Sequence, residues 1–190
     1  MNLFYEEFPK AVIVSGIEVP IVTDFREYIK MLDMLKDPDV SNEEKTYFLA
    51  DYFTDKIPDF NEAVKQLSDF VLMKSFATTG IDVEIEEKEE TREEKHLFSF
   101  EIDYPYILSG FLRDYGIDLS SVRYLHWWKF RMLFDGLSDD TEIKQRIMYR
   151  SLDLSTIKDK DERKRIQKIQ RSIQLPQEAL SDYDIGDMFA

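Results

Sequence analysis

Ten consecutive residues without an apolar side chain, residues 86–95, constrain the fold of this chain more than any other feature. Six of them are acidic and three are basic. Such a run cannot bury enough apolar surface to offset the conformational entropy that ordering would cost. We therefore expect a mobile loop or linker that marks a domain boundary, with an exposed turn of charged helix as the alternative.

The rest of the chain has enough apolar material for a packed core, since 43% of its 190 residues are hydrophobic and 14% are aromatic. At about 150 residues per domain, this length corresponds to one domain or two small ones. Apolar and acidic residues alternate on both sides of the charged run, which predicts short half-buried strands around residues 81–85 and 98–102. The expected regions are an N-terminal region (1–80), an acidic connection (81–102), a helical region (103–175) and an acidic tail (176–190).

The N-terminal region is predicted to begin with a β-hairpin. β-branched runs at residues 11–14 and 19–22 flank the turn pair Ser15-Gly16, and Pro20 favours an edge strand. Three helices with apolar stripes at helical spacing are predicted to follow, the second over residues 42–56. Their starts are marked by Thr23 or Asp24, then by a capping box of Ser41 and Glu44, then by Pro58 with Asp59.

The second half of the chain is predicted to be helical. Gly116 is a candidate left-handed C-cap for a helix that contains residues 106–115. The last helix is expected over residues 158–173. Two helices are predicted before it: the first starts at Asp118, Ser120 or Ser121, and the second starts at Ser138. The predicted fold class is therefore α+β and predominantly α-helical, with a small N-terminal β-hairpin with helices and a helical C-terminal half.

The net charge of −14 is distributed unevenly. Residues 1–122 carry a net charge of −15, residues 123–171 carry +5, and the remaining tail has four acids and no base. An acidic chain is a poor general binder of nucleic acid, because phosphate contacts need clustered cations. The basic segment could meet an acidic partner or fold back onto the acidic half.

No motif in the chain indicates catalysis. The sequence lacks Gly-rich phosphate loops, a nucleophile elbow and cysteine, and His96 and His126 lie in dissimilar contexts without metal-ligand spacing. We therefore expect no enzymatic activity, no catalytic residue, no metal and no cofactor. The N-terminus lacks the pattern of a secretion signal, and no stretch approaches the roughly 20 apolar residues of a membrane span.

Two features are candidates for partner binding. The adjacent residues Trp127 and Trp128, followed by Lys129, would point about 100° apart on a helix, so one ring could reach a partner. The alternative is that both rings belong to the internal core. The basic residues of the last helix, Arg163, Lys164, Lys168 and Arg171, surround a narrow isoleucine stripe, which fits either a docking helix or a terminal helix packed on its own domain.

Four motifs occur in order in the second half: Y-G-I-D-L at residues 115–119, L-H-W-W-K-F at 125–130, G-L-S-x-D-T at 136–141 and Y-R-x-x-D-L-S at 149–155. Together with P-K-A-V-I-V-S-G at residues 9–16, they resemble a family of tailed-bacteriophage proteins encoded in the tail module beside the tape-measure gene. The family is named for the fifteenth gene product of one such phage.

The resemblance implies a tail assembly chaperone that acts in the cytoplasm of the host bacterium. Such a protein would bind the helical tape-measure protein, keep it soluble and help to recruit tail-tube subunits, and it could be a homo-oligomer. No nucleic-acid or membrane partner is implied. The alternatives are a structural component retained in the tail or connector, and an acidic DNA mimic that inhibits a nucleic-acid-binding enzyme.

Overall fold

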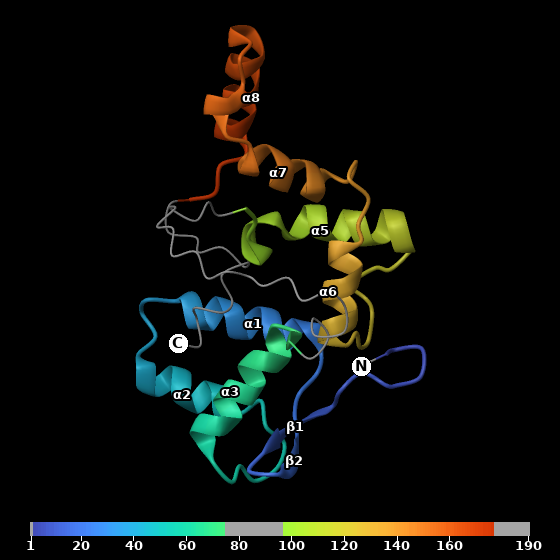
Figure 1. Ribbon diagram of the computed structural model, residues 1–190, viewed down its shortest axis with the longest axis vertical. Coiled ribbons are helices and arrows are strands. Elements are labelled where there is room, and N and C mark those ends of the chain that lie inside the picture. The colour runs from blue at the N-terminus through green and yellow to red at the C-terminus, as the bar shows by residue number, and fades with distance from the viewer. Residues whose placement is uncertain (1, 75–96, 177–190) are drawn as a thin grey trace. The chain divides into compact units, whose positions relative to one another are not determined.

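The computed structural model describes residues 2–74 and 97–176 (Figure 1). These residues form two compact units: unit 1 contains residues 2–74 and 124–132, and unit 2 contains residues 97–123 and 133–176. The predicted helical region is therefore interrupted, because residues 124–132 join the N-terminal elements. The predicted strand at 81–85, the charged run at 86–95 and the tail beyond Pro176 lie outside the described residues.

Unit 1 begins with the predicted hairpin. Strands β1 (Ala11–Val14) and β2 (Ile17–Pro20) pair antiparallel, with Val12 opposite Val19 (Figure 1). Ser15 and Gly16 both have positive φ angles, 51° and 76°, as a two-residue type I′ turn requires. The second strand begins two residues earlier than predicted, and the valines of the hairpin pack toward helix α3.

The three predicted helices of unit 1 are α1 (Phe25–Lys36), α2 (Asn42–Ala50) and α3 (Phe60–Val71). Asp24 and Asp59 cap α1 and α3, and the capping box of Ser41 and Glu44 is formed at the start of α2. Helix α2 ends six residues before the predicted end, because Tyr52 and Phe53 pair elsewhere. The amide of Val22 donates to the carbonyl of Tyr52, and Phe53 forms a β-bridge with Ile21.

Helix α6 (Trp127–Asp135) begins later than predicted and contributes residues to both units. The Asp118 carboxylate accepts hydrogen bonds from Ser120 and Ser121 within a turn, so it does not start a helix. The chain then pairs with the segment before α1. The amide of Trp127 donates to the carbonyl of Thr23, and the amide of Phe25 donates to the carbonyl of Leu125.

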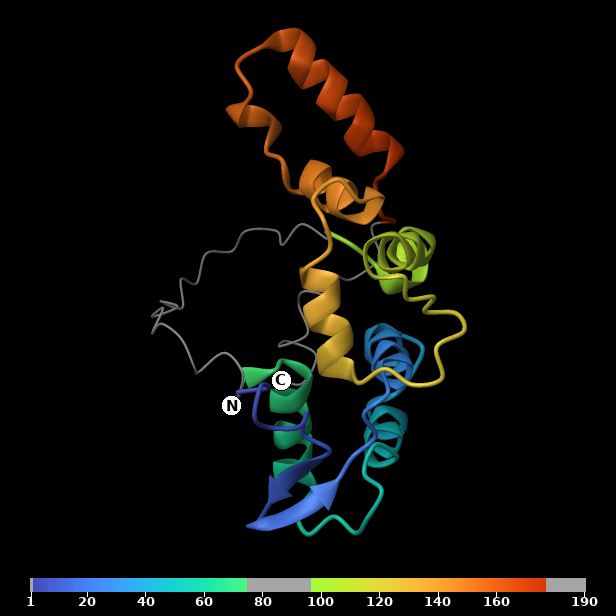
Figure 2. The same ribbon diagram turned by 90° about the vertical axis from the view of Figure 1, so that its right-hand side faces the viewer.

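Unit 2 is helical. It contains α5 (Phe100–Tyr115), α7 (Glu142–Ser151), the 3₁₀ turn η1 (Leu154–Thr156) and α8 (Lys160–Ser172). Helix α7 packs on α5, and α8 returns along η1 to the end of α7 (Figure 2).

Two predictions for unit 2 are corrected. The predicted strand at 98–102 is wrong, because Ser99 caps α5 by accepting a hydrogen bond from the Ile102 amide and the helix begins at Phe100. The N-cap of α7 is Thr141, three residues after the predicted Ser138. Gly116 takes the predicted left-handed conformation, with φ of 65°, at the end of α5. The fold class is α+β and predominantly α-helical, as predicted.

Candidate functional site

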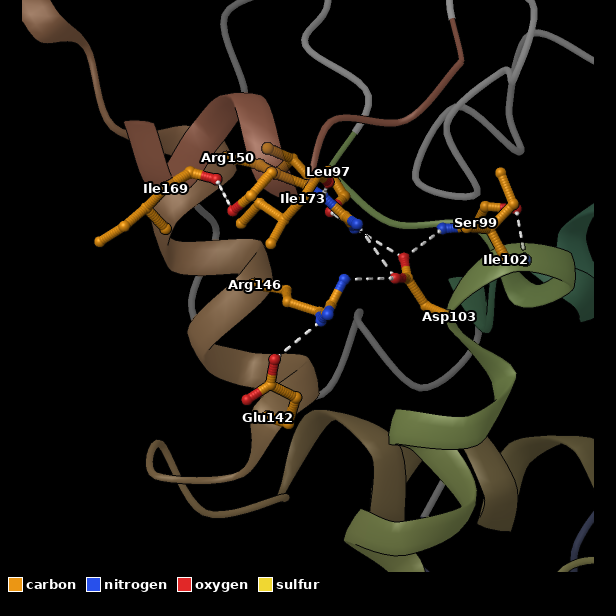
Figure 3. A network of polar contacts seen from close by, with 10 residues as sticks. Leu97, Ser99, Ile102, Asp103, Glu142, Arg146, Arg150, Ile169 and Ile173 are labelled. Atoms are coloured by element: carbon orange, nitrogen blue, oxygen red, sulfur yellow. Dashed lines mark hydrogen bonds and ion pairs between the residues drawn. The ribbon is translucent and has the colours of Figure 1, made fainter. Parts of the chain in front are cut away.

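A buried ion pair joins three segments of unit 2 (Figure 3). Arg150 of α7 makes two hydrogen bonds to Asp103 of α5, Nη1 to Oδ2 at 2.6 Å and Nη2 to Oδ1 at 3.0 Å. Asp103 is fully buried, and Arg150 is 8% exposed. A bidentate arginine–carboxylate pair fixes direction as well as distance, so the orientation of α7 on α5 is set by this contact.

Two further donors of Arg150 are also used. Its Nη1 donates to the carbonyl of Leu97 at 2.9 Å, and its Nε donates to the carbonyl of Ile173 at 2.8 Å. Ile173 is the C-cap residue of α8, so Arg150 stabilises an end of α8 that would otherwise have an unpaired carbonyl. We call Asp103, Arg150 and the two carbonyls the Arg150 clamp.

Arg146, one helical turn before Arg150, supports the clamp from outside. Its Nη1 lies 3.9 Å from the Asp103 carboxylate, and its Nε donates to Glu142 at 2.9 Å. Its guanidinium also lies over the Tyr106 ring, 3.7 Å from the ring centroid. Arg146 therefore adds positive potential beside Asp103 without a direct hydrogen bond to it (Figure 3).

Sequence reasoning missed the clamp, although the sequence contains a signal for it. Arg150 lies seven residues after the buried Ile143, and Asp103 lies four residues before the buried Ile107. Each charge therefore lies on the apolar face of its own helix. A charged residue in such a position needs a buried partner of opposite sign.

The clamp and Gln170 fix the C-terminal half of α8 against α7. The side-chain amide of Gln170 donates to the carbonyls of Tyr149 and Leu152, both at 2.8 Å. Ile166 is buried on the same side of the helix. The isoleucine stripe of α8 thus packs inward, as predicted for a terminal helix on its own domain. Its opposite face is left for solvent or a partner.

That opposite face is cationic. At about 100° per residue, Lys160, Lys164, Lys168 and Arg171 lie within a narrow arc on the side away from Ile166. All four are exposed, as are the flanking Arg163 and Arg165, and none of these six side chains forms an ion pair or hydrogen bond within residues 2–74 and 97–176. We call Lys160, Lys164, Lys168 and Arg171 the α8 ridge. The four predicted contacts Arg163, Lys164, Lys168 and Arg171 are thus all exposed.

Trp127 and Trp128 lie inside unit 1, which corrects their assignment to a contact surface. Trp127 is 0% exposed and Trp128 is 1% exposed. Their indole nitrogens donate to the carbonyls of Val71, at 3.1 Å, and Phe70, at 2.8 Å. These carbonyls belong to the last turn of α3, and that of Phe70 also accepts a hydrogen bond from the Met73 amide at 3.0 Å. The two rings are therefore core residues that also cap α3.

Lys129, the third predicted contact of α6, is exposed and forms no ion pair with any residue that the structure describes. It belongs to unit 1, whereas the α8 ridge belongs to unit 2. The seven predicted contact residues therefore do not form one group. Two are core residues, one is a separate exposed lysine, and four belong to the cationic side of α8.

His126 has a structural role at the start of α6. Its Nδ1 accepts a hydrogen bond from the Trp128 amide at 3.1 Å, which requires that nitrogen to be unprotonated. Its Nε2 therefore carries the proton and donates to the carbonyl of Pro9 at 2.9 Å. Burial lowers the pKa of His126, because the charged ring would lose its hydration. The Phe8 ring stacks on the imidazole at 4.8 Å.

Neither a metal centre nor a membrane span is found in the described part of the chain. Within it, no group of three or more acidic, histidine or cysteine side chains is placed to hold a metal ion. No helix among the same residues combines the length and the apolar character needed to cross a bilayer.

Comparison with known proteins identifies the family of this chain. Neither the curated proteins nor the solved structures that were compared include a match to this chain. The family model described as bacteriophage Gp15 protein matches residues 4–175, which include both units, the Arg150 clamp and the α8 ridge. The chain therefore belongs to the bacteriophage Gp15 protein family.

Proposed function

We propose that this phage protein is a tail assembly chaperone that binds the tape-measure protein and helps to recruit tail-tube subunits, without catalysing a reaction. The single observation that carries the proposal is the α8 ridge, a row of cations without partners among residues 2–74 and 97–176. The Arg150 clamp holds the other side of this helix in place. A helix presented in this way is suited to binding a polypeptide partner.

The surface chemistry of the chain is compatible with a chaperone for a long helical protein. The cations of α8 would steer acidic segments of such a partner toward the helix. An apolar line on the outer side of α5, with the exposed residues Ile102, Pro105 and Leu112, could cover apolar stripes of the same partner. The net charge of −14 would keep the complex dispersed in the host cytoplasm.

The test is co-expression with the tape-measure protein encoded nearby. We expect the wild-type chain to keep the tape measure in the soluble fraction and to be recovered with it. The variant Lys164→Glu/Lys168→Glu should lose both effects. The matched control Lys56→Glu/Lys65→Glu makes the same charge change at exposed lysines of unit 1 and should retain them.

If the wild-type chain changes neither the solubility nor the recovery of the tape measure, the proposal is wrong. Mass spectrometry of purified phage particles gives a second criterion. A chaperone should be missing from finished particles, whereas a stoichiometric amount of this chain would identify it as a structural component of the tail.

A further inference from the structure

The exposed side of α2 carries a row of two acidic residues and a tyrosine, whereas the α8 ridge is entirely cationic. Glu43, Tyr47 and Asp51 follow one another at four-residue spacing and therefore lie on one line along the helix. Tyr47 is 76% exposed, and Phe48 beside it is also exposed. The carboxylates of Glu43 and Asp51 form no ion pair with the residues described here. We call Glu43, Tyr47 and Asp51 the α2 row.

The charges of α2 are not neutralised within the helix. Asp51 is its C-cap residue, where the helix dipole disfavours an anion, and the last turn contains no basic residue. The lysine of the helix, Lys45, donates to the carbonyl of Leu35 at 2.8 Å. The neighbouring Glu44 is engaged by Ser41 in the capping box, and these hydrogen bonds lower its pKa. A cation from another molecule would therefore stabilise the Asp51 end of the helix.

The α8 ridge matches the α2 row in spacing. Glu43 and Asp51 are eight residues apart, as are Lys160 and Lys168, and eight residues of helix span about 12 Å. With the two helices side by side, both carboxylates can meet an ammonium group while Lys164 lies at the level of Tyr47. An ammonium over an exposed tyrosine ring is attracted by the negative face of the ring.

We propose that the α8 ridge of one copy docks on the α2 row of a second copy. The two surfaces of this contact are different, so a bound pair of copies still offers one free ridge and one free row. Such a head-to-tail contact generates either a closed ring or an open chain. The inference does not depend on the proposed function, since it concerns only how the chain associates with itself.

The contact consists of exposed charges around aromatic rings, which sets its expected strength. Exposed ion pairs contribute little each and are screened by salt, so association should be weak and sensitive to salt. At about 1 M salt the screening length falls to about 3 Å, and the association should be lost.

The experiment is sedimentation velocity of the full chain over a wide range of protein concentration. The wild type should form larger species as the concentration rises. The variants Glu43→Lys/Asp51→Lys and Lys160→Glu/Lys168→Glu, which reverse the charges that face one another, should each stay dissociated up to protein concentrations roughly tenfold higher than the wild type, or more. The control Lys56→Glu/Lys65→Glu should behave as wild type, and circular dichroism should show the same helix content for all four proteins.

Mixing the two reversed variants is the decisive measurement. One carries cations on both helices and the other carries anions on both, so neither should associate alone. In the mixture, each reversed helix meets a helix of opposite charge, and association should return. A contact between α2 and α8 of the same chain would not be restored by mixing.

Three results would overturn the proposal: a wild type that stays monomeric at all concentrations, association unaffected by either reversal, or a mixture that stays monomeric. These results are separable from the tape-measure test. Glu43→Lys/Asp51→Lys keeps the α8 ridge, so it should still solubilise the tape measure if the proposed function is correct.

Discussion

Replacement of the buried Arg150 by methionine should destabilise unit 2 more than removal of any other charged side chain of α7. Methionine keeps much of the length of the side chain but removes every donor. Among the residues that the structure describes, the Asp103 carboxylate would keep only the Ser99 amide, at 3.1 Å, as a direct hydrogen-bond donor. The carbonyls of Leu97 and Ile173 would lose the guanidinium that binds them.

The expected loss follows from these contacts. Removing one member of a buried ion pair costs about 3–5 kcal/mol, because the other charge stays buried without compensation. Arg146 is close enough to Asp103 to offset part of this cost, which favours the lower end of that range. Each carbonyl left without a donor adds about 1 kcal/mol. The free energy of unfolding of unit 2 should therefore fall by about 5 kcal/mol.

The two units can be followed separately. Both tryptophans of the chain belong to unit 1, so tryptophan fluorescence reports on that unit. Hydrogen exchange of the α8 amides reports on unit 2, because α8 is held at Ile173 by the clamp. Since about 1.4 kcal/mol corresponds to a factor of ten, Arg150→Met should accelerate exchange in α8 by at least about a hundredfold.

Arg146→Met is the matched control, because it is the same substitution one helical turn earlier. Arg146 is partly exposed and makes no direct hydrogen bond to Asp103, so the expected loss is about 1 kcal/mol. If Arg150→Met and Arg146→Met accelerate exchange in α8 equally, the clamp does not hold the helix and the reasoning fails. Arg150→Lys keeps the positive charge but loses the bidentate contact, so its effect should lie between those of Arg146→Met and Arg150→Met.

Three further predictions concern other contacts. Trp128→Phe removes the indole donor to the Phe70 carbonyl, which keeps the Met73 amide at 3.0 Å, and should lower the free energy of unfolding by about 1 kcal/mol in urea titration; unchanged stability would show that the carbonyl needs no indole partner. The lowered pKa of His126 means that its stabilising contribution is complete above the unfolded pKa of about 6.5 and is lost as the pH falls from there through the lower pKa of the folded state. Thermal unfolding should therefore show a larger loss of stability on acidification for wild type than for His126→Gln, and equal slopes would refute the assignment. Gly116→Ala places a β-carbon at a φ of 65° and should cost about 1–2 kcal/mol, which a thermal melt would detect.

Local signals in the sequence were sufficient for much of the fold. Asp24, Ser41 and Asp59 were predicted as caps or helix starts, and each lies at the N-cap of a helix. Ser15-Gly16 and Gly116 were predicted from turn chemistry and take the expected left-handed conformations. These features depend on hydrogen bonds and backbone angles within a few residues, so the sequence alone specifies them.

The start of α6 shows where local signals fail. Asp118, Ser120 and Ser121 have the side chains of N-cap residues, but they bond to one another in a turn. The helix begins at Trp127, where residues 124–127 pair with the segment before α1, roughly a hundred residues away in sequence. A capping pattern identifies a place where a helix can begin, and long-range backbone pairing decides whether it does.

The roles of the charged residues in α7 and α8 depend on their positions relative to the apolar stripe of the same helix. The predictions from the sequence did not use those positions. Arg150 and Asp103 each lie on the apolar face of their own helix, and they bind each other. The cations of the α8 ridge lie opposite Ile166, and they stay exposed without partners among the described residues. The position of a charge relative to the apolar stripe of its own helix therefore separates a charge that stabilises the fold from one that is available to a partner. By this criterion Glu43 and Asp51 of α2 fall in the same class as the α8 ridge, because they lie on the side of α2 away from the buried Leu49.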